Sequence, residues 1–133
     1  MFKKPYEVRM LDMKADPRGN LFEILRFLDD EIPGEGYIYT FTILPGQRRG
    51  DHYHEKKHEW FTCAFGRATI LIETSDGKKE RVVLDAEDPA VIYFAPGTAH
   101  ALLNETNNTV VMVSYGSKQH DPANPDTIKK DLS

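Results

Sequence analysis

The feature that most constrains the fold is a series of short apolar or alternating runs, separated by turn signals, with almost no helical periodicity. Such runs are typical of β-strands, and their regular spacing predicts an all-β barrel or sandwich. The predicted strands cover residues 21–27, 37–44, 59–65, 67–74, 79–84, 90–95, 100–104 and 109–115. The connections carry turn residues, including an Asp-Gly pair at 76–77, Asn residues within 105–109 and Pro/Gly turns at 16–20 and 44–47.

The chain is the size of one ordinary domain. Its 133 residues, 40% of them hydrophobic, are enough to bury a single core without disulfides. We expect one domain over residues 1–116, with an N-terminal strand extension. Residues 117–133 are Pro-rich and polar. This tail is expected to pack on the barrel or leave it as irregular structure, with a short helical turn at 126–130.

Charge and hydropathy exclude several classes of partner. A net charge of −4 argues against a nucleic-acid binder that works through bulk charge. The sequence lacks a run of about 18 apolar residues and the apolar segment of a secretion signal, so we expect a cytoplasmic protein without a membrane partner. The single cysteine, Cys63, lies in an apolar run and is expected to be a buried strand residue.

The strongest chemical signal is a histidine-rich stretch between Gly46 and Gly66. One residue separates His52 from His54, and four residues separate His54 from Glu59. Alternation along an extended segment puts the two histidines on one face, and a hairpin-like return brings Glu59 beside them. His100 begins a later strand after a Pro/Gly turn. Three imidazoles and a carboxylate suit a divalent transition metal, with zinc as the first choice and iron, manganese or nickel as alternatives.

This spacing resembles the first motif of the cupin family at every defined position. The second cupin motif is met at Gly97, His100 and Asn104, whereas Pro89 replaces its usual Gly and Ala95 its usual Pro. The resemblance implies a double-stranded β-helix, a jelly-roll-like barrel that is commonly a homodimer. It also implies that the metal ligands are His52, His54, Glu59 and His100.

A narrower resemblance covers nearly the whole chain. The segments DPRGNLFEILR, RRGDHYHEKKHEWF and HDPANPDT are similar to the C-terminal cupin domain of capsular polysaccharide enzymes that epimerise a UDP-linked keto-deoxy amino sugar. Nucleotide-sugar 3,4-ketoisomerases and the 3,5-epimerases of rhamnose synthesis are less similar. The resemblance implies a sugar-nucleotide epimerase or isomerase of surface polysaccharide biosynthesis. His58 stands where the capsular cupins have Asn, and it is either an additional acid/base or an exposed residue.

Epimerisation next to a carbonyl needs a base that removes a carbon-bound proton and an acid that returns it. If a metal engages the four ligands, the candidate catalytic residues are Tyr39, Tyr53, His58 and Tyr115. Without a metal, His52 or His54 becomes the base.

Other residues of the same region have simpler roles. Arg48 and Arg49 either grip a nucleotide diphosphate or form a solvated turn. Aromatic residues at strand spacing are more often core than stacking platforms; those that could stack on a base or sugar are Tyr37, Trp60 and Tyr93. Lys56 and Lys57 are expected to be solvated only.

Two rival functions remain open at this point. One is a dioxygenase-type cupin that binds iron and activates oxygen, and the other is a sugar-binding cupin without catalysis. The cavity wall discriminates the first from a sugar-nucleotide enzyme. A basic, aromatic mouth around Arg48 and Arg49 favours a nucleotide sugar, and a small apolar pocket favours an oxygenase substrate.

Overall fold

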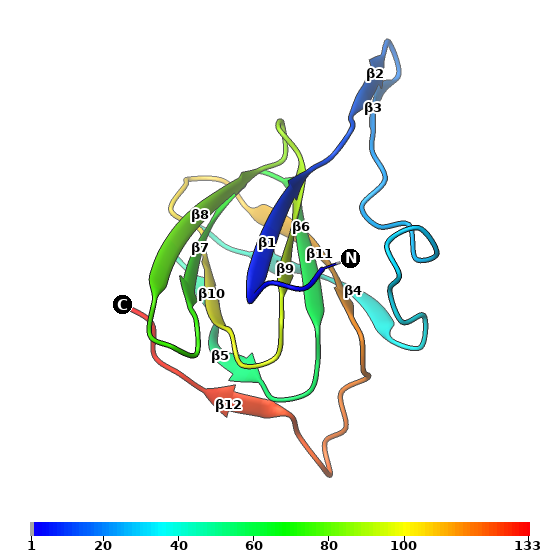
Figure 1. The fold of residues 1–133 in the computed structure, drawn as a ribbon. Coiled ribbons are helices and arrows are strands. Elements are labelled where there is room, and N and C mark those ends of the chain that lie inside the picture. Colours follow the sequence, from blue (N-terminus) through cyan, green and yellow to red (C-terminus); the bar gives the residue numbers. More distant parts are fainter. Residues whose placement is uncertain (1) are drawn as a thin grey trace.

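The structure, a computed structural model, describes residues 2–133, and within that range it contains strands and no helix (Figure 1). Two antiparallel five-stranded sheets and a separate hairpin make up the fold. The first sheet has the order β1-β9-β6-β11-β4, built from Tyr6–Met10, Ala90–Phe94, Glu59–Phe65, Val110–Gly116 and Tyr37–Ile43. The second has the order β12-β5-β10-β7-β8, built from Thr127–Lys129, Arg48–His54, Ala99–Leu103, Arg67–Glu73 and Lys79–Asp85. The hairpin pairs β2 (Lys14–Asp16) with β3 (Gly19–Leu21).

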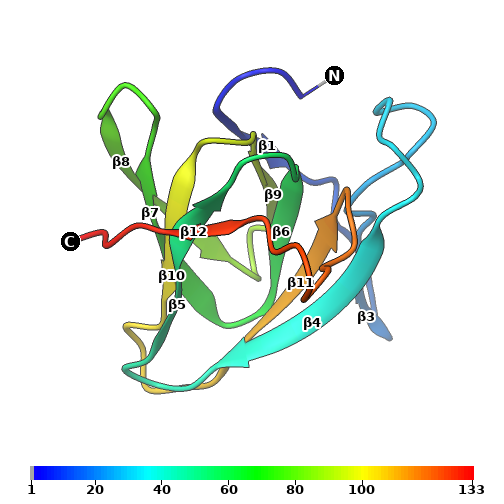
Figure 2. The same ribbon diagram turned by 90° about the horizontal axis from the view of Figure 1, so that it is seen from below.

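The two sheets face each other and enclose the main core, as the view along the barrel in Figure 2 shows. Inward-facing residues of both sheets pack together there, among them Phe61, Ile70, Ile92 and Met112. Neighbouring strands are mostly far apart in the sequence, as expected for a jelly roll. The all-β prediction is therefore confirmed.

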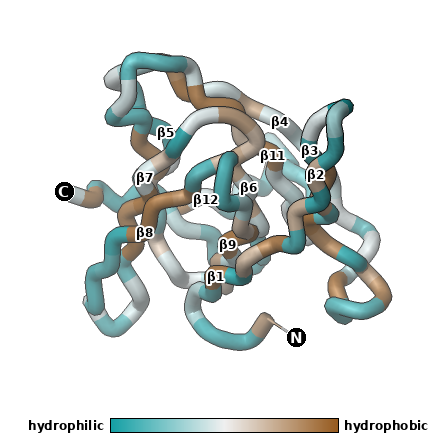
Figure 3. Tube along the Cα trace, turned by 90° about the horizontal axis from the view of Figure 1, so that it is seen from above, coloured by the Kyte–Doolittle hydropathy of each residue, from teal (hydrophilic) through white to brown (hydrophobic). Residues whose placement is uncertain are grey.

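The hairpin β2–β3 projects away from the barrel, and its tip is hydrophilic (Figure 3). Seven of the eight predicted strands are present, but the strand predicted at 21–27 is wrong. Residues 22–27 are irregular in the structure and have no ladder partner. Their apolar alternation has a different cause, because Ile24, Leu25 and Phe27 pack onto the outer face of the first sheet.

The C-terminal tail also differs from its prediction, because residues 127–129 form a strand where a helical turn was expected at 126–130. Strand β12 pairs with β5, with Thr127 opposite His54 and Lys129 opposite His52. It runs beside β5 across one end of the barrel in Figures 1 and 2. The edge of β5 supplies backbone partners that the local sequence does not reveal, so tertiary pairing overrides the local propensity.

Residues 2–133 hold no helix with the length and apolar character needed to cross a membrane.

Candidate metal centre and cavity

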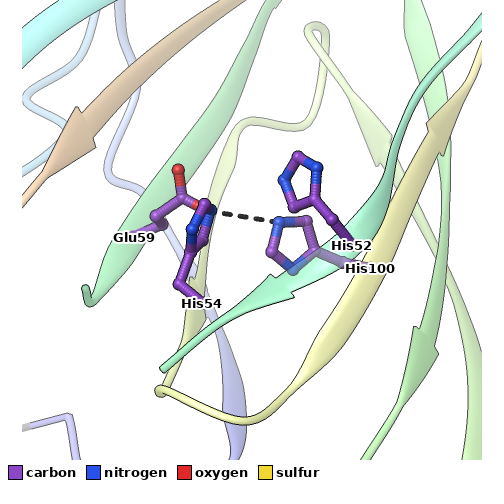
Figure 4. A group of neighbouring side chains, drawn as sticks. All are labelled: His52, His54, Glu59 and His100. Atoms are coloured by element: carbon purple, nitrogen blue, oxygen red, sulfur yellow. Dashed lines mark ion pairs between the residues drawn. The ribbon is translucent and has the colours of Figure 1, made fainter. Parts of the chain in front are cut away.

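The structure brings the four predicted ligands together at one end of the barrel (Figure 4). His52 and His54 come from β5, Glu59 from the start of β6 and His100 from β10. Their nearest ligand atoms all lie within 4.8 Å of one another. Three of the residues are deeply buried, with relative exposures of 5% for His54, 2% for Glu59 and 1% for His100, and His52 is half-buried.

Backbone carbonyls orient two of the imidazoles. His54 Nδ1 lies 2.9 Å from the carbonyl oxygen of Asp126, and His100 Nδ1 lies 3.1 Å from that of Thr98. A carbonyl oxygen can only accept a hydrogen bond, so each Nδ1 carries the proton. Each Nε2 is then a lone-pair donor, and both point at the carboxylate of Glu59.

Three buried acceptor atoms meet at this point. Glu59 Oε1 lies 2.9 Å from His54 Nε2 and 3.2 Å from His100 Nε2. Within residues 2–133, none of these three atoms has a hydrogen-bond partner of good geometry. Converging lone pairs in a buried site are unfavourable unless a cation lies between them. Nitrogen and oxygen donors in this arrangement fit a divalent transition metal.

The charge states also suit a metal. Burial would raise the pKa of Glu59, but in the absence of a metal the adjacent imidazoles of His100 and His54, when protonated, hold that pKa well below its ordinary value. Burial, together with the neighbouring His100 and His54, lowers the pKa of His52 to about 4. Near neutral pH the carboxylate is therefore ionised and the His52 ring is neutral, which are the forms that bind metals.

Tyr39 is oriented by the second oxygen of the carboxylate. Its hydroxyl donates to Glu59 Oε2 over 3.0 Å, which leaves Oε1 to face the histidines. Burial, followed by the charge of Glu59, raises the pKa of Tyr39 above its ordinary value. The phenol is therefore a hydrogen-bond donor that holds Glu59, as expected of a group that orients a metal ligand.

A cavity of about 350 Å³ opens over the four side chains. Its wall is basic and aromatic, and the residues that line it beyond the predicted ligands include Tyr37, Tyr39, Phe41, Arg49, Lys57 and His120. Lys57, expected to be only solvated, is 8% exposed, so that prediction is wrong. Its Nζ donates to Tyr37 Oη over 2.9 Å and lies 3.7 Å from Glu59 Oε2. A Lys between two polar residues carries no local signal of burial, because only the closed barrel supplies its partners.

The two arginines that were predicted to bind a diphosphate point in different directions. Arg49 lines the cavity, with its guanidinium 5.6 Å from the centre of the Phe41 ring. Arg48 instead pairs with Asp51 and donates to the carbonyl of Leu132. The cause is a bulge, since the register shifts between the His100–His52 and Ala101–Gly50 pairs.

Gly50 makes this bulge possible. Its φ is +91°, and a Cβ there would lie 2.7 Å from the carbonyl oxygen of His100. Only glycine adopts such a backbone without strain. Strict alternation along β5 would have placed Arg48 on the same side as His52 and His54. The extra residue of the bulge shifts the alternation by one position, so Arg49 lies on that side instead.

Three of the predicted catalytic residues do not line the cavity. Tyr115 packs on the outer face of the first sheet, where its hydroxyl donates to the carbonyl of Pro33 and accepts from the N–H of Gly36. Tyr53 packs outside the second sheet, in the cluster that contains Leu132. Strand parity is the reason, because each lies one position out of phase with the cavity-facing residues.

His58, the third of these residues, is neither exposed nor in the cavity. It is half-buried on the outer face of the first sheet, where its Nδ1 lies 2.6 Å from Tyr93 Oη. Burial lowers its pKa. Trp60 and Tyr93 are core residues of the same outer cluster, whereas Tyr37 lines the cavity. Cys63 is buried on β6, as predicted.

Comparison of the sequence with known proteins gives one family and two curated relatives. Residues 14–128 match the family described as Polysaccharide biosynthesis C-terminal domain. The UDP-2-acetamido-2,6-beta-L-arabino-hexul-4-ose reductase of Pseudomonas aeruginosa is 30% identical over 116 residues, which cover 86% of this chain and 30% of the reductase. The probable low-salt glycan biosynthesis epimerase Agl13 of Haloferax volcanii is 30% identical over 129 residues, which cover 90% of this chain and 82% of the epimerase. The chain thus spans less than a third of the reductase and most of the epimerase.

Solved structures share the fold. The capsular polysaccharide assembling protein CapF of Staphylococcus aureus aligns with a TM-score of 0.71 and 23% identity, over 92% of this chain and 34% of CapF. A dTDP sugar isomerase of Desulfovibrio desulfuricans aligns with a TM-score of 0.85 and 13% identity, over 95% and 83% of the two chains. QdtA, a sugar 3,4-ketoisomerase of Thermoanaerobacterium thermosaccharolyticum solved with TDP, has a TM-score of 0.77 and 23% identity, over 95% and 88%. These likenesses confirm the predicted cupin double-stranded β-helix.

Proposed function

Because the chain belongs to the polysaccharide biosynthesis C-terminal domain family, we propose that it is an enzyme of surface polysaccharide biosynthesis that acts on a nucleotide-linked keto-deoxy sugar. The reaction is an epimerisation or keto-isomerisation that begins with removal of a proton next to a carbonyl. Agl13 is named as a probable glycan biosynthesis epimerase and QdtA as a sugar 3,4-ketoisomerase, which supports this class. The observation that carries the proposal is the meeting of three unpartnered buried acceptors beneath a basic, aromatic cavity.

In this proposal the metal ligands are His52, His54, Glu59 and His100. Zinc is the first choice, and iron, manganese or nickel are alternatives. A metal bound there supplies Lewis acidity that polarises the ketone oxygen of the sugar. Glu59 presents a single oxygen, Oε1, to the metal, because Oε2 accepts a hydrogen bond from the hydroxyl of Tyr39.

Proton transfer is assigned to the cavity phenols. Tyr39 is committed to Glu59, so its role is to orient that carboxylate. Tyr37 differs, because its oxygen accepts a hydrogen bond from Lys57 while its own proton stays available to a ligand in the cavity. The ammonium also favours negative charge as it develops on that oxygen. We therefore assign the acid/base role to Tyr37.

Arg49 is assigned to the diphosphate of the nucleotide. Its Nε donates to the carbonyl of Thr42, which fixes the guanidinium at the cavity mouth with other N–H groups free to bind phosphate. The guanidinium of Arg49 and the ammonium of Lys57 in the wall also favour a sugar nucleotide over the apolar substrate expected for an oxygenase. A cytoplasmic homodimer completes the proposal, and light scattering of the purified protein tests the dimer.

The decisive experiment is incubation with a panel of UDP- and TDP-4-keto-6-deoxy sugars in D₂O. Deuterium should enter next to the ketone, and mass spectrometry or NMR detects it. Removal of metal with a chelator should stop the exchange, and added zinc should restore it. Exchange that survives chelation would shift the base role to the neutral ring of His52. No exchange with any sugar of the panel, in zinc-loaded protein, would contradict the enzymatic proposal and favour a binding protein.

A further inference from the structure

The C-terminal segment is a wall of the site as well as a tail. Strand β12 pairs with β5 directly beside the ligands, with Thr127 opposite His54. Beyond the strand, the N–H of Lys130 donates to the carbonyl of Asp51 over 2.8 Å. Thr127 also lines the cavity over the four ligands. The segment is therefore attached along the length of β5 that carries two of the ligands.

Asp126, which immediately precedes β12, holds the turn that joins His54 to Glu59. Its carboxylate accepts hydrogen bonds from the N–H groups of Glu55 at 2.8 Å, Lys56 at 3.0 Å and Lys57 at 2.9 Å. Three successive amides bound by one carboxylate leave this turn little freedom, because bonds between amides and an ionised acceptor are the stronger kind. The separation between His54 and Glu59 therefore depends on Asp126.

The same residue also sets the tautomer of a ligand. The carbonyl oxygen of Asp126 accepts the proton of His54 Nδ1, so Nε2 faces Glu59. The carbonyl belongs to the residue whose side chain is anchored on the turn, so loss of the carboxylate bonds removes one of the two anchors of this carbonyl and leaves only the pairing of Thr127 with His54. The comparable bond of His100 goes to Thr98, which Asp126 does not contact through any hydrogen bond of residues 2–133.

We propose that Asp126 is a positioning residue of the metal centre, in addition to Tyr39. Its carboxylate holds the turn between two ligands, and its carbonyl holds the His54 ring in the metal-binding tautomer. The inference deepens the proposed function and rests on its metal site. Partners of this kind in metal sites typically change metal affinity by about 10–100-fold when they are removed.

The test compares Asp126→Ala and Asp126→Asn with the control Asp121→Ala, in the full chain. Asp121 lies in the same segment and is exposed, and among residues 2–133 its carboxylate bonds only to the N–H of Ala123. Zinc affinity is measured by competition with a chromogenic chelator. We expect Asp126→Ala to weaken zinc binding by about 10–100-fold, Asp126→Asn to weaken it less because its amide oxygen still accepts, and the control to match the wild type. Equal affinity of Asp126→Ala and wild type would overturn the proposal.

A second readout separates positioning from general stability. In metal-free, ¹⁵N-labelled protein, the ring nitrogens report the tautomers of His54 and His100 directly. Asp126→Ala should lose the single Nδ1–H tautomer at His54 and retain it at His100. Retention of this tautomer at both rings would overturn the proposal. Because the readout uses metal-free protein, it tests the role of Asp126 even if the wild type binds no zinc. If the alanine variant does not fold, the asparagine variant gives the same two readouts.

Discussion

Aromatic residues cover both faces of the sheet β1-β9-β6-β11-β4, but the two faces have different chemistry. On the inner face, Tyr37 and Tyr39 direct their hydroxyls at Lys57 and Glu59 in the cavity. On the outer face, Trp60, Tyr93 and Tyr115 pack with one another and with the irregular segment 22–32. Residue type is therefore a poor guide to role in this sheet.

Strand phase decides between the two faces. Tyr39 pairs with Ser114 across the ladder, and the next residue, Tyr115, pairs with Ile38. The two tyrosines lie on adjacent strands and one pair apart, yet their side chains point to opposite sides. The inner face directs hydroxyl groups into the cavity, whereas the outer face closes a second apolar cluster against the N-terminal segment.

The largest expected effect is on metal-dependent stability. Zinc should raise the free energy of unfolding by about 4 kcal/mol when free zinc is about 1,000-fold above its dissociation constant. His100→Ala should abolish this increase, whereas His58→Ala, on the outer face, should keep it. Thermal unfolding with and without zinc measures both. An undiminished zinc effect in His100→Ala would contradict the ligand assignment.

Removal of a hydroxyl from the inner face should affect catalysis. Tyr37→Phe should slow deuterium exchange into the sugar by on the order of 10²–10⁴-fold, the usual contribution of a positioned acid or base. Its matched control is Tyr115→Phe, the same chemical change on the outer face, which should leave the exchange rate unchanged. Similar rates in the Tyr37 variant and wild type would remove Tyr37 from the mechanism.

The same control should affect stability instead. The hydroxyl of Tyr115 bonds to the carbonyl of Pro33 and the N–H of Gly36, and phenylalanine leaves both backbone groups without that partner. We expect Tyr115→Phe to lower the free energy of unfolding by about 1–3 kcal/mol. Denaturant titration measures the loss. If Tyr37→Phe lowered the free energy of unfolding by as much, the hydroxyl groups of the two faces would not differ in their contribution to stability, and the comparison would fail.

The smallest expected effect is on the free energy of unfolding and on how it changes at acid pH. Asp30 anchors the covering segment to Arg9 through two hydrogen bonds, of 2.8 and 3.0 Å, and the bond from Arg9 lowers the pKa of this carboxyl. The ionised carboxylate of Asp30 stabilises the fold fully when the pH is above the pKa of the unfolded residue, about 3.9. This stabilisation disappears as the pH falls through the lower pKa of the folded residue. At neutral pH, Asp30→Asn should cost about 1 kcal/mol, discounted for the partly exposed arginine. Once the pH lies below the lowered pKa of folded Asp30, the difference from wild type should vanish, and a difference that grew with acid would contradict the assignment.

Much of the fold was predictable because it depends on local pattern. Period-two alternation and turn residues identified seven strands, and the spacing of His52, His54 and Glu59 matched a metal-binding motif. Five strands lay outside the predicted set: β1, which was expected only as an N-terminal extension without bounds, and β2, β3, β5 and β12. Four of them are short and mostly not deeply buried, and β5 is rich in charged and polar residues, so apolar residues mark all five weakly. The apolar alternation at 22–27 was misleading because a covering segment and a strand can share one pattern.

The sequence by itself determined the β class, the ranges of most strands and the four candidate ligands, because these follow from side-chain chemistry and from the spacing of residues within short motifs. Only the tertiary structure decided which arginine reaches the cavity, which face Tyr115 occupies, why Lys57 is buried and what orients His54. Each of these depends on register between distant segments: the bulge at Gly50 is defined against His100, and Asp126 contacts a ligand 72 residues away. Local sequence carries no signal for such pairs, because their free energy arises only when the barrel closes.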